Sequence, residues 1–322
     1  MFNQYEKIFD SPNQWILTKK EQKLFEKTEW IVTEKIHGSN LSIIVFKDND
    51  NIMVQFAKRT KILNDFENFF SYKLIKDKLE TSAKRLYNIL LKVYDFDSIQ
   101  IYGELYGGYY NHPDIKNLNM PIQTGISYSP DIQYVAYDIM INKKDSKKYL
   151  NYIDTIEFLK ESDFDVLKSI FVGKYSEAMF FNPRFESEIY KKFGLPKIKN
   201  NFAEGIVVRS SKNILVPIKN GVVRPLIKIK IPEFKEESMD FKSLSYDEMI
   251  NNCINNNRIN AYISKVGKIE NIDIALEDIF LDILETCLSN ENFDIYWKNS
   301  NEENKCRIKY EIFEKIEKYF KF

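Results

Sequence analysis

Between residues 30 and 60 the chain carries three short apolar runs separated by turn-forming residues, and this pattern limits the possible fold more than any other feature. The runs cover residues 30–33, 41–46 and 52–57. Residues 48–51, with the sequence Asp-Asn-Asp-Asn, supply turn chemistry between the last two runs. The pattern predicts three strands in an antiparallel meander.

Three later apolar runs, residues 99–102, 134–137 and 205–208, each adjoin charged residues or glycine. Short runs of this kind are typical of strands, and we expect these three to end at a functional site. Residues 66–92 differ, because their apolar side chains recur at mixed spacings of three and four. That spacing predicts an amphipathic helix or a pair of helices.

In the last third of the chain the sequence pattern changes from that of strands to that of helices. Residues 225–232 alternate apolar and basic side chains between two prolines, which predicts a strand with Lys228 and Lys230 on one face. Residues 233–240 are polar and aperiodic, as in a connector. Ser245 and Glu248 then have the spacing of a capping box, and helical patterns follow over residues 250–266, 274–288 and 308–319.

We therefore predict the α+β class, with two domains. An antiparallel-sheet domain would span residues 1–242, and a small all-α domain would span residues 243–322. A chain of 322 residues is long enough for two such domains. The 44% of apolar residues and 15% of aromatic residues predict folded cores.

Composition also limits the compartment and the partners. The three cysteines have no metal-ligand spacing and leave one unpaired, which favours a reducing compartment. No segment has the apolar length of a membrane span or the layout of a secretion signal. We therefore expect a soluble, cytoplasmic and monomeric protein without a membrane partner.

Charge divides unevenly along a chain whose formal net charge is zero. Residues 1–242 carry 37 Lys and Arg against 32 Asp and Glu, whereas residues 243–322 carry 10 against 15. A polyanion is therefore better placed on the first domain.

Lys35 is the candidate nucleophile. It follows the first predicted strand, in the stretch Glu-Lys-Ile-His-Gly-Ser-Asn of residues 34–40. A lysine amine attacks a phosphoryl centre only when neutral, and nearby cations such as Lys228 and Lys230 depress its pKa. Gly38 would let the backbone approach a nucleotide closely.

Two carboxylates at predicted strand edges, Glu104 and Glu204, are candidate ligands for magnesium. Magnesium is commonly held by one or two carboxylates together with substrate phosphates. Tyr137 and Asp138 would add an aromatic face for a base and a neighbouring carboxylate. Each of these features alone is common at strand ends, so the prediction depends on the ordered set.

In that order, the set resembles the covalent nucleotidyltransferase superfamily and, within it, the RNA ligase 2 family. The five motifs fall at Lys35, Glu104, Tyr137-Asp138, Glu204 and Lys228-Ile229-Lys230. DNA ligases and capping enzymes carry Asp where this chain has His37. Further family-like stretches are residues 57–60, 69–70, 257–260 and 264–267.

The resemblance implies roles around the nucleotide. Lys35 would be the adenylated nucleophile, and Glu34 would read the adenine. Tyr137 would stack under the base, Val207 would lie against its other face, and Glu104 would hold the ribose.

It also implies roles around the phosphates, with ATP and Mg²⁺ (or Mn²⁺) as cofactors. Glu104 and Glu204 would hold the metal, and Lys228 would act with Glu204 around the metal and the nucleophile. Lys230 would hold the α-phosphate, and His37 would assist the departure of pyrophosphate.

In the later steps Asn40 and Arg59 would contact AMP and the RNA 5′-phosphate. The chain departs from the family at two positions. Family members often carry Lys where Arg209 stands and Phe where Tyr137 stands, and Arg is not equivalent to Lys at a phosphate.

The function implied is an ATP-dependent RNA ligase that joins 5′-phosphate and 3′-hydroxyl RNA ends at nicks in a duplex. Arg258 and Lys265 would be phosphate contacts in the helical domain. The bridging strand could be RNA or DNA. The alternatives are a DNA ligase or capping guanylyltransferase, which share the lysine, and a non-catalytic RNA-binding or repair-scaffold protein with the same fold.

Overall fold

The computed structural model describes residues 2–144, 146–236 and 244–320. Its backbone contacts divide the chain into two compact units, Met1–Ile231 and Pro232–Phe322. The domain boundary predicted near residue 242 falls within residues 237–243, outside the described part of the chain. Each unit is described by itself below.

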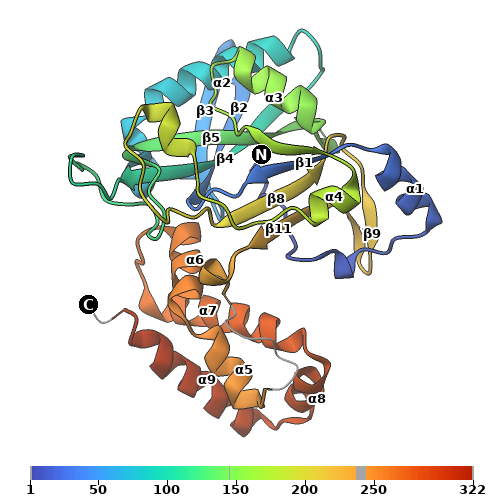
Figure 1. Cartoon of the computed structure of the whole chain (residues 1–322), viewed down its shortest axis with the longest axis vertical. Coiled ribbons are helices and arrows are strands. Elements are labelled where there is room, and N and C mark those ends of the chain that lie inside the picture. The colour runs from blue at the N-terminus through green and yellow to red at the C-terminus, as the bar shows by residue number, and fades with distance from the viewer. Residues whose placement is uncertain (1, 145, 237–243, 321–322) are drawn as a thin grey trace. The chain divides into compact units, whose positions relative to one another are not determined.

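The first unit contains a five-stranded antiparallel sheet in the order β3-β2-β4-β5-β6 (Figure 1). The strands are β2 (Ser39–Asp48), β3 (Asn51–Lys58), β4 (Ser98–Tyr109), β5 (Ser129–Lys143) and β6 (Ser146–Tyr149). Asn49, in the turn between β2 and β3, has φ +52°, a left-handed conformation that asparagine tolerates. The hairpin predicted around residues 48–51 is therefore confirmed.

A second antiparallel sheet of four strands has the order β11-β8-β1-β7. Its strands are β1 (Trp30–Glu34), β7 (Ser169–Gly173), β8 (Gly205–Ser210) and β11 (Leu226–Lys230), and β9 (Val216–Ile218) pairs separately with β10 (Gly221–Val223). The predicted three-stranded meander is wrong in this respect, because β1 pairs with β7 and β8 and not with β2. The chain changes sheets at residues 35–38.

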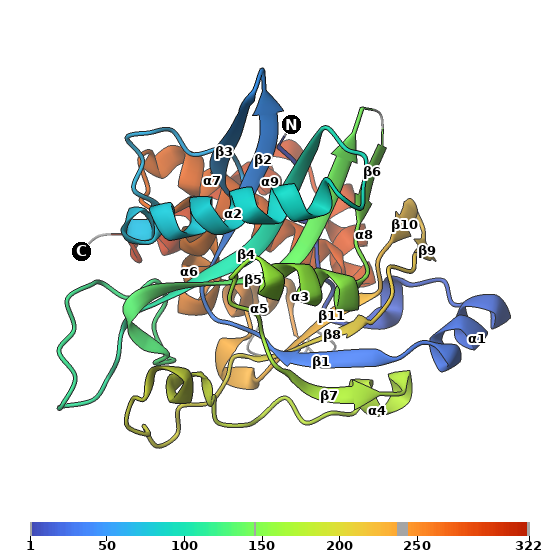
Figure 2. The same cartoon turned by 90° about the horizontal axis from the view of Figure 1, so that it is seen from above.

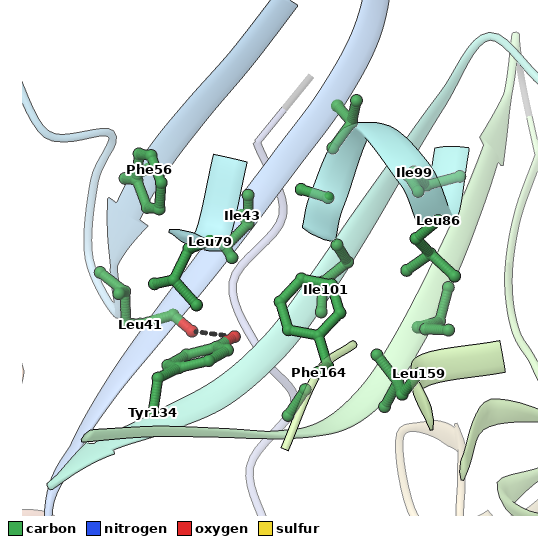
Figure 3. Close-up of a cluster of buried hydrophobic side chains, with 14 of the residues drawn as sticks. Leu41, Ile43, Phe56, Leu79, Leu86, Ile99, Ile101, Tyr134, Leu159 and Phe164 are labelled. Atoms are coloured by element: carbon green, nitrogen blue, oxygen red, sulfur yellow. Dashed lines mark hydrogen bonds between the residues drawn. The ribbon is translucent and has the colours of Figure 1, made fainter. Parts of the chain in front are cut away.

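Two helices cover one face of the five-stranded sheet (Figure 2). They are α2 (Lys76–Leu90) and α3 (Tyr152–Glu161), and α2 is preceded by the 3₁₀ segment η2 (Phe69–Leu74). The amphipathic helix or pair of helices predicted over residues 66–92 appears as a 3₁₀ segment followed by one helix. Leu79 and Leu86 of α2 lie over Ile43 and Ile101 of the sheet (Figure 3).

A separate apolar cluster surrounds β1. Trp30, which is fully buried, packs against Phe25 of α1 (Lys19–Lys27) and Tyr175 of α4 (Tyr175–Met179). A capping box begins α1, in which Thr18 and Glu21 bond to each other's backbone amides. These contacts hold β1 in the centre of its sheet, directly before the candidate nucleophile.

The second unit is helical in its described part. It contains α5 (Tyr246–Cys253), α6 (Asn256–Val266), α7 (Ile272–Leu288), α8 (Glu291–Asn299), α9 (Glu302–Glu317) and the 3₁₀ turn η4 (Pro232–Phe234). The capping box predicted at Ser245 and Glu248 is present. The pattern did not predict α8. Cys253 and Cys287 are buried, and Cys306 is exposed.

Arg258 has a structural place in this unit that the sequence did not predict. Its side chain is 3% exposed, donates to the Cys253 carbonyl at 2.9 Å and pairs with Asp282. A guanidinium buried in this way holds α6 against α7, so its expected role as a phosphate contact is wrong for this conformation. Lys265 is more exposed and lies 3.8 Å from Asp282. Among the described residues, no helix is long and apolar enough to cross a membrane.

Candidate active site

Lys35 lies where the chain passes from one sheet to the other. It follows β1 of the four-stranded sheet directly, and β2 of the five-stranded sheet begins at Ser39. Its backbone amide donates to the Gly205 carbonyl at 2.9 Å. The turn of residues 35–38 is therefore attached to β8 and connects the two sheets, so side chains of both sheets can converge on it.

Glu204 is the centre of a buried cluster of charges. One carboxylate oxygen accepts from Lys35 Nζ at 2.7 Å and lies 3.3 Å from His37 Nδ1, and the other lies 3.2 Å from Lys230 Nζ. Burial alone would raise the pKa of Glu204, but Lys35, His37 and Lys230 together hold it well below its ordinary value. The carboxylate is ionised and holds the Lys35 amine.

The two lysines of β11 have different partners. Lys230 reaches Glu204, whereas Lys228 lies 3.5 Å from Asp10 and is more exposed. Both side chains lie on one face of the strand, as the alternation predicted. Lys230 supplies the predicted cation near Lys35, but it shares one carboxylate with that lysine.

Two glycines are needed for this close packing. A Cβ on Gly38 would lie 2.2 Å from the Leu105 carbonyl oxygen, and a Cβ on Gly205 would lie 2.0 Å from the Ile229 carbonyl oxygen. Gly205 also has φ +152°, which other residues rarely adopt. Gly38 therefore brings the turn of residues 35–38 against β4, next to Glu104.

Glu104, on β4 of the five-stranded sheet, is close enough to Lys35 for the charge of Lys35 to act on it. Burial raises its pKa to about 8, Lys35 and Arg59 act to lower it, and Glu204 acts to raise it. Within the described residues, no hydrogen bond or ion pair joins its carboxylate to another side chain. Such a group is suited to take a cation or a ligand hydroxyl.

Asn40 and Tyr137 lie on the same face of the five-stranded sheet as Glu104. Asn40 lies directly opposite Glu104 across β2 and β4, and its Nδ2 donates to the Tyr137 hydroxyl at 2.7 Å. Arg59 follows β3 directly, and its charge acts on both Glu104 and Tyr137. The fold thus brings Asn40, Arg59 and Tyr137 close to Glu104.

Glu34 and Val207 belong to β1 and β8. Burial raises the pKa of Glu34 to about 7, although a hydrogen bond from Ser187 acts to lower it. One of its oxygens, Oε1, is buried without a hydrogen bond. Val207 is buried and lies opposite Thr33, one residue from Glu34. An unsatisfied buried oxygen can accept from a ligand amine.

The sequence pattern of the RNA ligase family matches residues 28–230, well over half of the chain. This chain belongs to the RNA ligase family. The match contains every predicted site residue from Glu34 to Lys230.

Among curated relatives, the mitochondrial RNA-editing ligase 1 of Trypanosoma brucei brucei is 23% identical over 286 residues, covering 79% of this chain and 61% of the relative. RNA-editing ligase 2 of the same organism is 29% identical over 234 residues, covering 66% and 56%. The chain thus spans about three-fifths of the length of the curated relatives that it matches.

Among solved structures, a variant of the Naegleria gruberi RNA ligase with ATP and Mn is 13% identical, with a TM-score of 0.45. That match covers 72% of this chain and 57% of the other. Another variant of the same ligase, with AMP and Mn, gives 12% identity and a TM-score of 0.46, with 72% and 56% covered.

The residues present fit a divalent cation next to nucleotide phosphates. Glu204 is close enough to Glu104 to act on its pKa. Among the described residues, no protein cation is bonded to the Glu104 carboxylate. The described residues contain no group of three or more His, Cys, Asp or Glu placed to hold a metal. Glu104 and Glu204 remain the candidate donors, and two carboxylates completed by phosphate oxygens and water would suit magnesium.

In this member of the RNA ligase family, sequence reasoning missed a second buried network behind Tyr137. Asp138 takes two hydrogen bonds of 3.0 Å from Arg224 and one of 2.5 Å from the Tyr5 hydroxyl. Arg224 and Arg209 outweigh the effect of burial and lower the pKa of Asp138. Tyr5 lies before the family match and in no periodic pattern, so the sequence offered no signal for it.

Tyr128 was also missed. Its hydroxyl accepts a hydrogen bond of 3.1 Å from the backbone amide of His37, and its ring is fully buried. This contact attaches the turn of residues 35–38 to the start of β5, because Tyr128 directly precedes that strand. A tyrosine outside every motif could not have been singled out from the sequence.

Proposed function

We propose that this chain is an ATP-dependent RNA ligase that seals 5′-phosphate and 3′-hydroxyl RNA ends at nicks in a duplex. The observation that carries the proposal is the contact of Lys35 with Glu204, inside a cluster that also contains His37, Lys230 and Glu104. A lysine that lies beside an ionised carboxylate and a second lysine, where two sheets meet, is suited to phosphoryl chemistry. The adenylyl-transfer residues are assigned to residues 1–242, and residues 243–322 form a helical C-terminal domain that helps to hold RNA.

In the first step Lys35 Nζ attacks the α-phosphorus of ATP, and pyrophosphate leaves. Glu204 orients the amine and accepts its hydrogen bond at 2.7 Å. Attack requires the neutral amine, so one proton passes from Nζ to solvent before attack, and a second passes to solvent as the P–N bond forms and the P–O bond to pyrophosphate breaks. Lys230, 3.2 Å from Glu204, supplies positive charge for the phosphate oxygens, and His37, whose Nδ1 lies 3.3 Å from Glu204, assists the departure of pyrophosphate.

The base would lie between Tyr137 and Val207, with Glu34 accepting from its amine and Glu104 from the ribose. A bound divalent cation, held by Glu104 and Glu204, would neutralise charge on the phosphates. Lys228, on the same face of β11 as Lys230, adds a second cation for phosphate or metal-bound groups.

In the second step AMP passes from Lys35 to the RNA 5′-phosphate, and the P–N bond breaks as a P–O–P bond forms. In the third step an RNA 3′-hydroxyl attacks the activated 5′-phosphate and AMP leaves. Arg59 and Asn40, next to Glu104, are assigned to these later contacts. The proton lost by the 3′-hydroxyl passes to solvent.

The substrate assignment is tested by supplying the protein with labelled 5′-phosphate RNA in two forms, a nicked duplex and a single strand. We expect ATP to support formation of the longer product with the nicked duplex, and GTP not to support it. Product with single strands alone would contradict the nick assignment. Transfer of GMP to a 5′-diphosphate end would instead indicate a capping enzyme.

A further inference from the structure

Tyr137 occupies a bulge in the five-stranded sheet. Tyr102 of β4 pairs with Asp138 and Gly103 pairs with Ala136, so Tyr137 is the one extra residue on β5 at this point. A bulge bends the strand and re-aims the side chain of the unpaired residue. The Tyr137 carbonyl accepts a hydrogen bond of 3.3 Å from Arg209 Nη1. Because Arg209 belongs to β8, this bond ties the bulge to that strand.

The re-aimed hydroxyl reaches across β4 to Asn40 on β2. Asn40 Nδ2 has two protons, and it donates to the Gly103 carbonyl at 3.3 Å and to the Tyr137 hydroxyl at 2.7 Å. The Gly103 carbonyl can only accept, so it requires the amide nitrogen and not the amide oxygen on this side. The two contacts together fix the orientation of the Asn40 amide.

The remaining polar atom of that amide is Oδ1. No hydrogen bond joins Oδ1 to another residue in the described part of the chain. Asn40 lies opposite Glu104 on adjacent strands, so both side chains lie on the same face of the sheet. Oδ1 is therefore presented as an acceptor beside Glu104, where a ligand hydroxyl can reach it.

We propose that the Tyr137 hydroxyl is a positioning group that holds the Asn40 amide with its oxygen directed at the bound nucleotide or RNA. A phenylalanine ring could stack on a base equally well but could not accept from Nδ2. The tyrosine at this position therefore adds a link between β5 and Asn40 of β2, two residues beyond the turn of residues 35–38. This inference rests on the proposed ligase function.

The test is a double-mutant cycle on nick sealing with Tyr137→Phe, Asn40→Ala and the double variant. We expect Tyr137→Phe to lower the sealing rate about tenfold, the effect of one lost hydrogen bond at a placed group. The double variant should be no slower than Asn40→Ala, because the hydroxyl acts through that amide. The proposal would be wrong if the two single substitutions lowered the sealing rate by factors that multiply in the double variant. It would also be wrong if Tyr137→Phe sealed at the native rate.

Tyr134→Phe is the matched control. Tyr134 lies on the same strand, and its hydroxyl donates to the Leu41 carbonyl at 3.1 Å on the apolar face of the sheet (Figure 3). The same chemical change there should combine multiplicatively with Asn40→Ala. If Tyr134→Phe proved as strongly coupled to Asn40 as Tyr137→Phe, the effect would belong to the whole sheet and the proposal would be wrong.

A second measurement separates this inference from the ligase activity. The four proteins of the cycle are unfolded in urea without nucleotide, and we expect the Tyr137 and Asn40 substitutions to be non-additive in their unfolding midpoints. If the two substitutions changed the unfolding midpoint additively, the proposed hydrogen bond between Tyr137 and Asn40 would be wrong, even if the protein were an active ligase. A native protein that forms no lysyl-AMP would refute the proposed function, and the urea cycle would still decide the link.

Discussion

Three carboxylates of the candidate site differ in what surrounds them. Glu204 is surrounded by Lys35, His37 and Lys230, and its pKa is low. Burial instead raises the pKa of Glu104 to about 8 and that of Glu34 to about 7. Spacing in the sequence could predict these residue types near one another. It could not predict which carboxylate would be paired, because that depends on contacts between the two sheets.

Glu34→Gln tests the burial of this carboxylate through the pH dependence of stability. A carboxyl whose folded pKa is about 7 and whose unfolded pKa is about 4.5 costs stability increasingly as pH rises from 4.5 to 7. Relative to the wild type, the Gln variant should therefore gain on the order of 2–3 kcal/mol between pH 4.5 and pH 8. Urea unfolding at both pH values measures this gain.

The exposed Glu29, just before β1, provides the control for that measurement. Glu29→Gln should follow the pH dependence of the wild type. If the difference between Glu34→Gln and the wild type were the same at pH 4.5 and pH 8, Glu34 would not be the buried carboxylate described above.

At the scale of elements, local patterns predicted much of the fold. The β2–β3 hairpin, the strand at residues 226–230 and the capping box of α5 were visible because each depends on residues close in sequence. The pairing of β1 was predicted wrongly. Residues 35–38 resemble a hairpin connection, but Gly38 packs against β4 and the chain passes to the other sheet.

Gly38→Ala tests whether this crossing sets the geometry of the site. A Cβ there would lie 2.2 Å from the Leu105 carbonyl oxygen and 2.9 Å from Glu104 Cγ, so the turn must move. A displacement of about 1 Å at a nucleophile can cost on the order of a hundredfold in rate, and we expect a loss of that size in lysine adenylation.

Gly194→Ala is the comparison for that variant. A Cβ on Gly194 meets no atom within 4 Å, although its φ of +64° makes alanine there unfavourable by about 1–2 kcal/mol. We expect this variant to lose stability and to keep its adenylation rate at saturating ATP. Equal adenylation by Gly38→Ala and the native protein would contradict the account of the turn.

Leu86→Ala tests the packing of α2 on the five-stranded sheet. Leu86 is completely buried in that core, so its truncation should lower the free energy of unfolding by about 2–5 kcal/mol. Leu91, at the C-terminal end of the same helix, is 47% exposed and should tolerate alanine with little change. Equal unfolding midpoints for the two variants in urea would exclude the described packing.

For the whole molecule, the sequence predicted an antiparallel-sheet unit followed by helices, and the described residues have that arrangement. The ordered motifs identified Lys35, Glu104, Tyr137, Glu204 and Lys230 before their contacts were known. The sequence could not predict the network of Tyr5, Asp138 and Arg224, because its members are up to 219 residues apart and follow no pattern. Long-range ion pairs of this kind appear only once the chain is folded.

The central claim is that Lys35 forms a covalent bond to AMP. The most direct measurement incubates the protein with ATP labelled at the α-phosphate and a divalent cation, and then maps protein-bound label by peptide mass spectrometry at neutral to alkaline pH, because a P–N bond is labile in acid. We predict label on the peptide that contains Lys35, its loss in Lys35→Ala, and its retention in Lys47→Ala, which changes an exposed lysine of β2. Absence of label from the native protein, or label that persists in Lys35→Ala, would contradict the account.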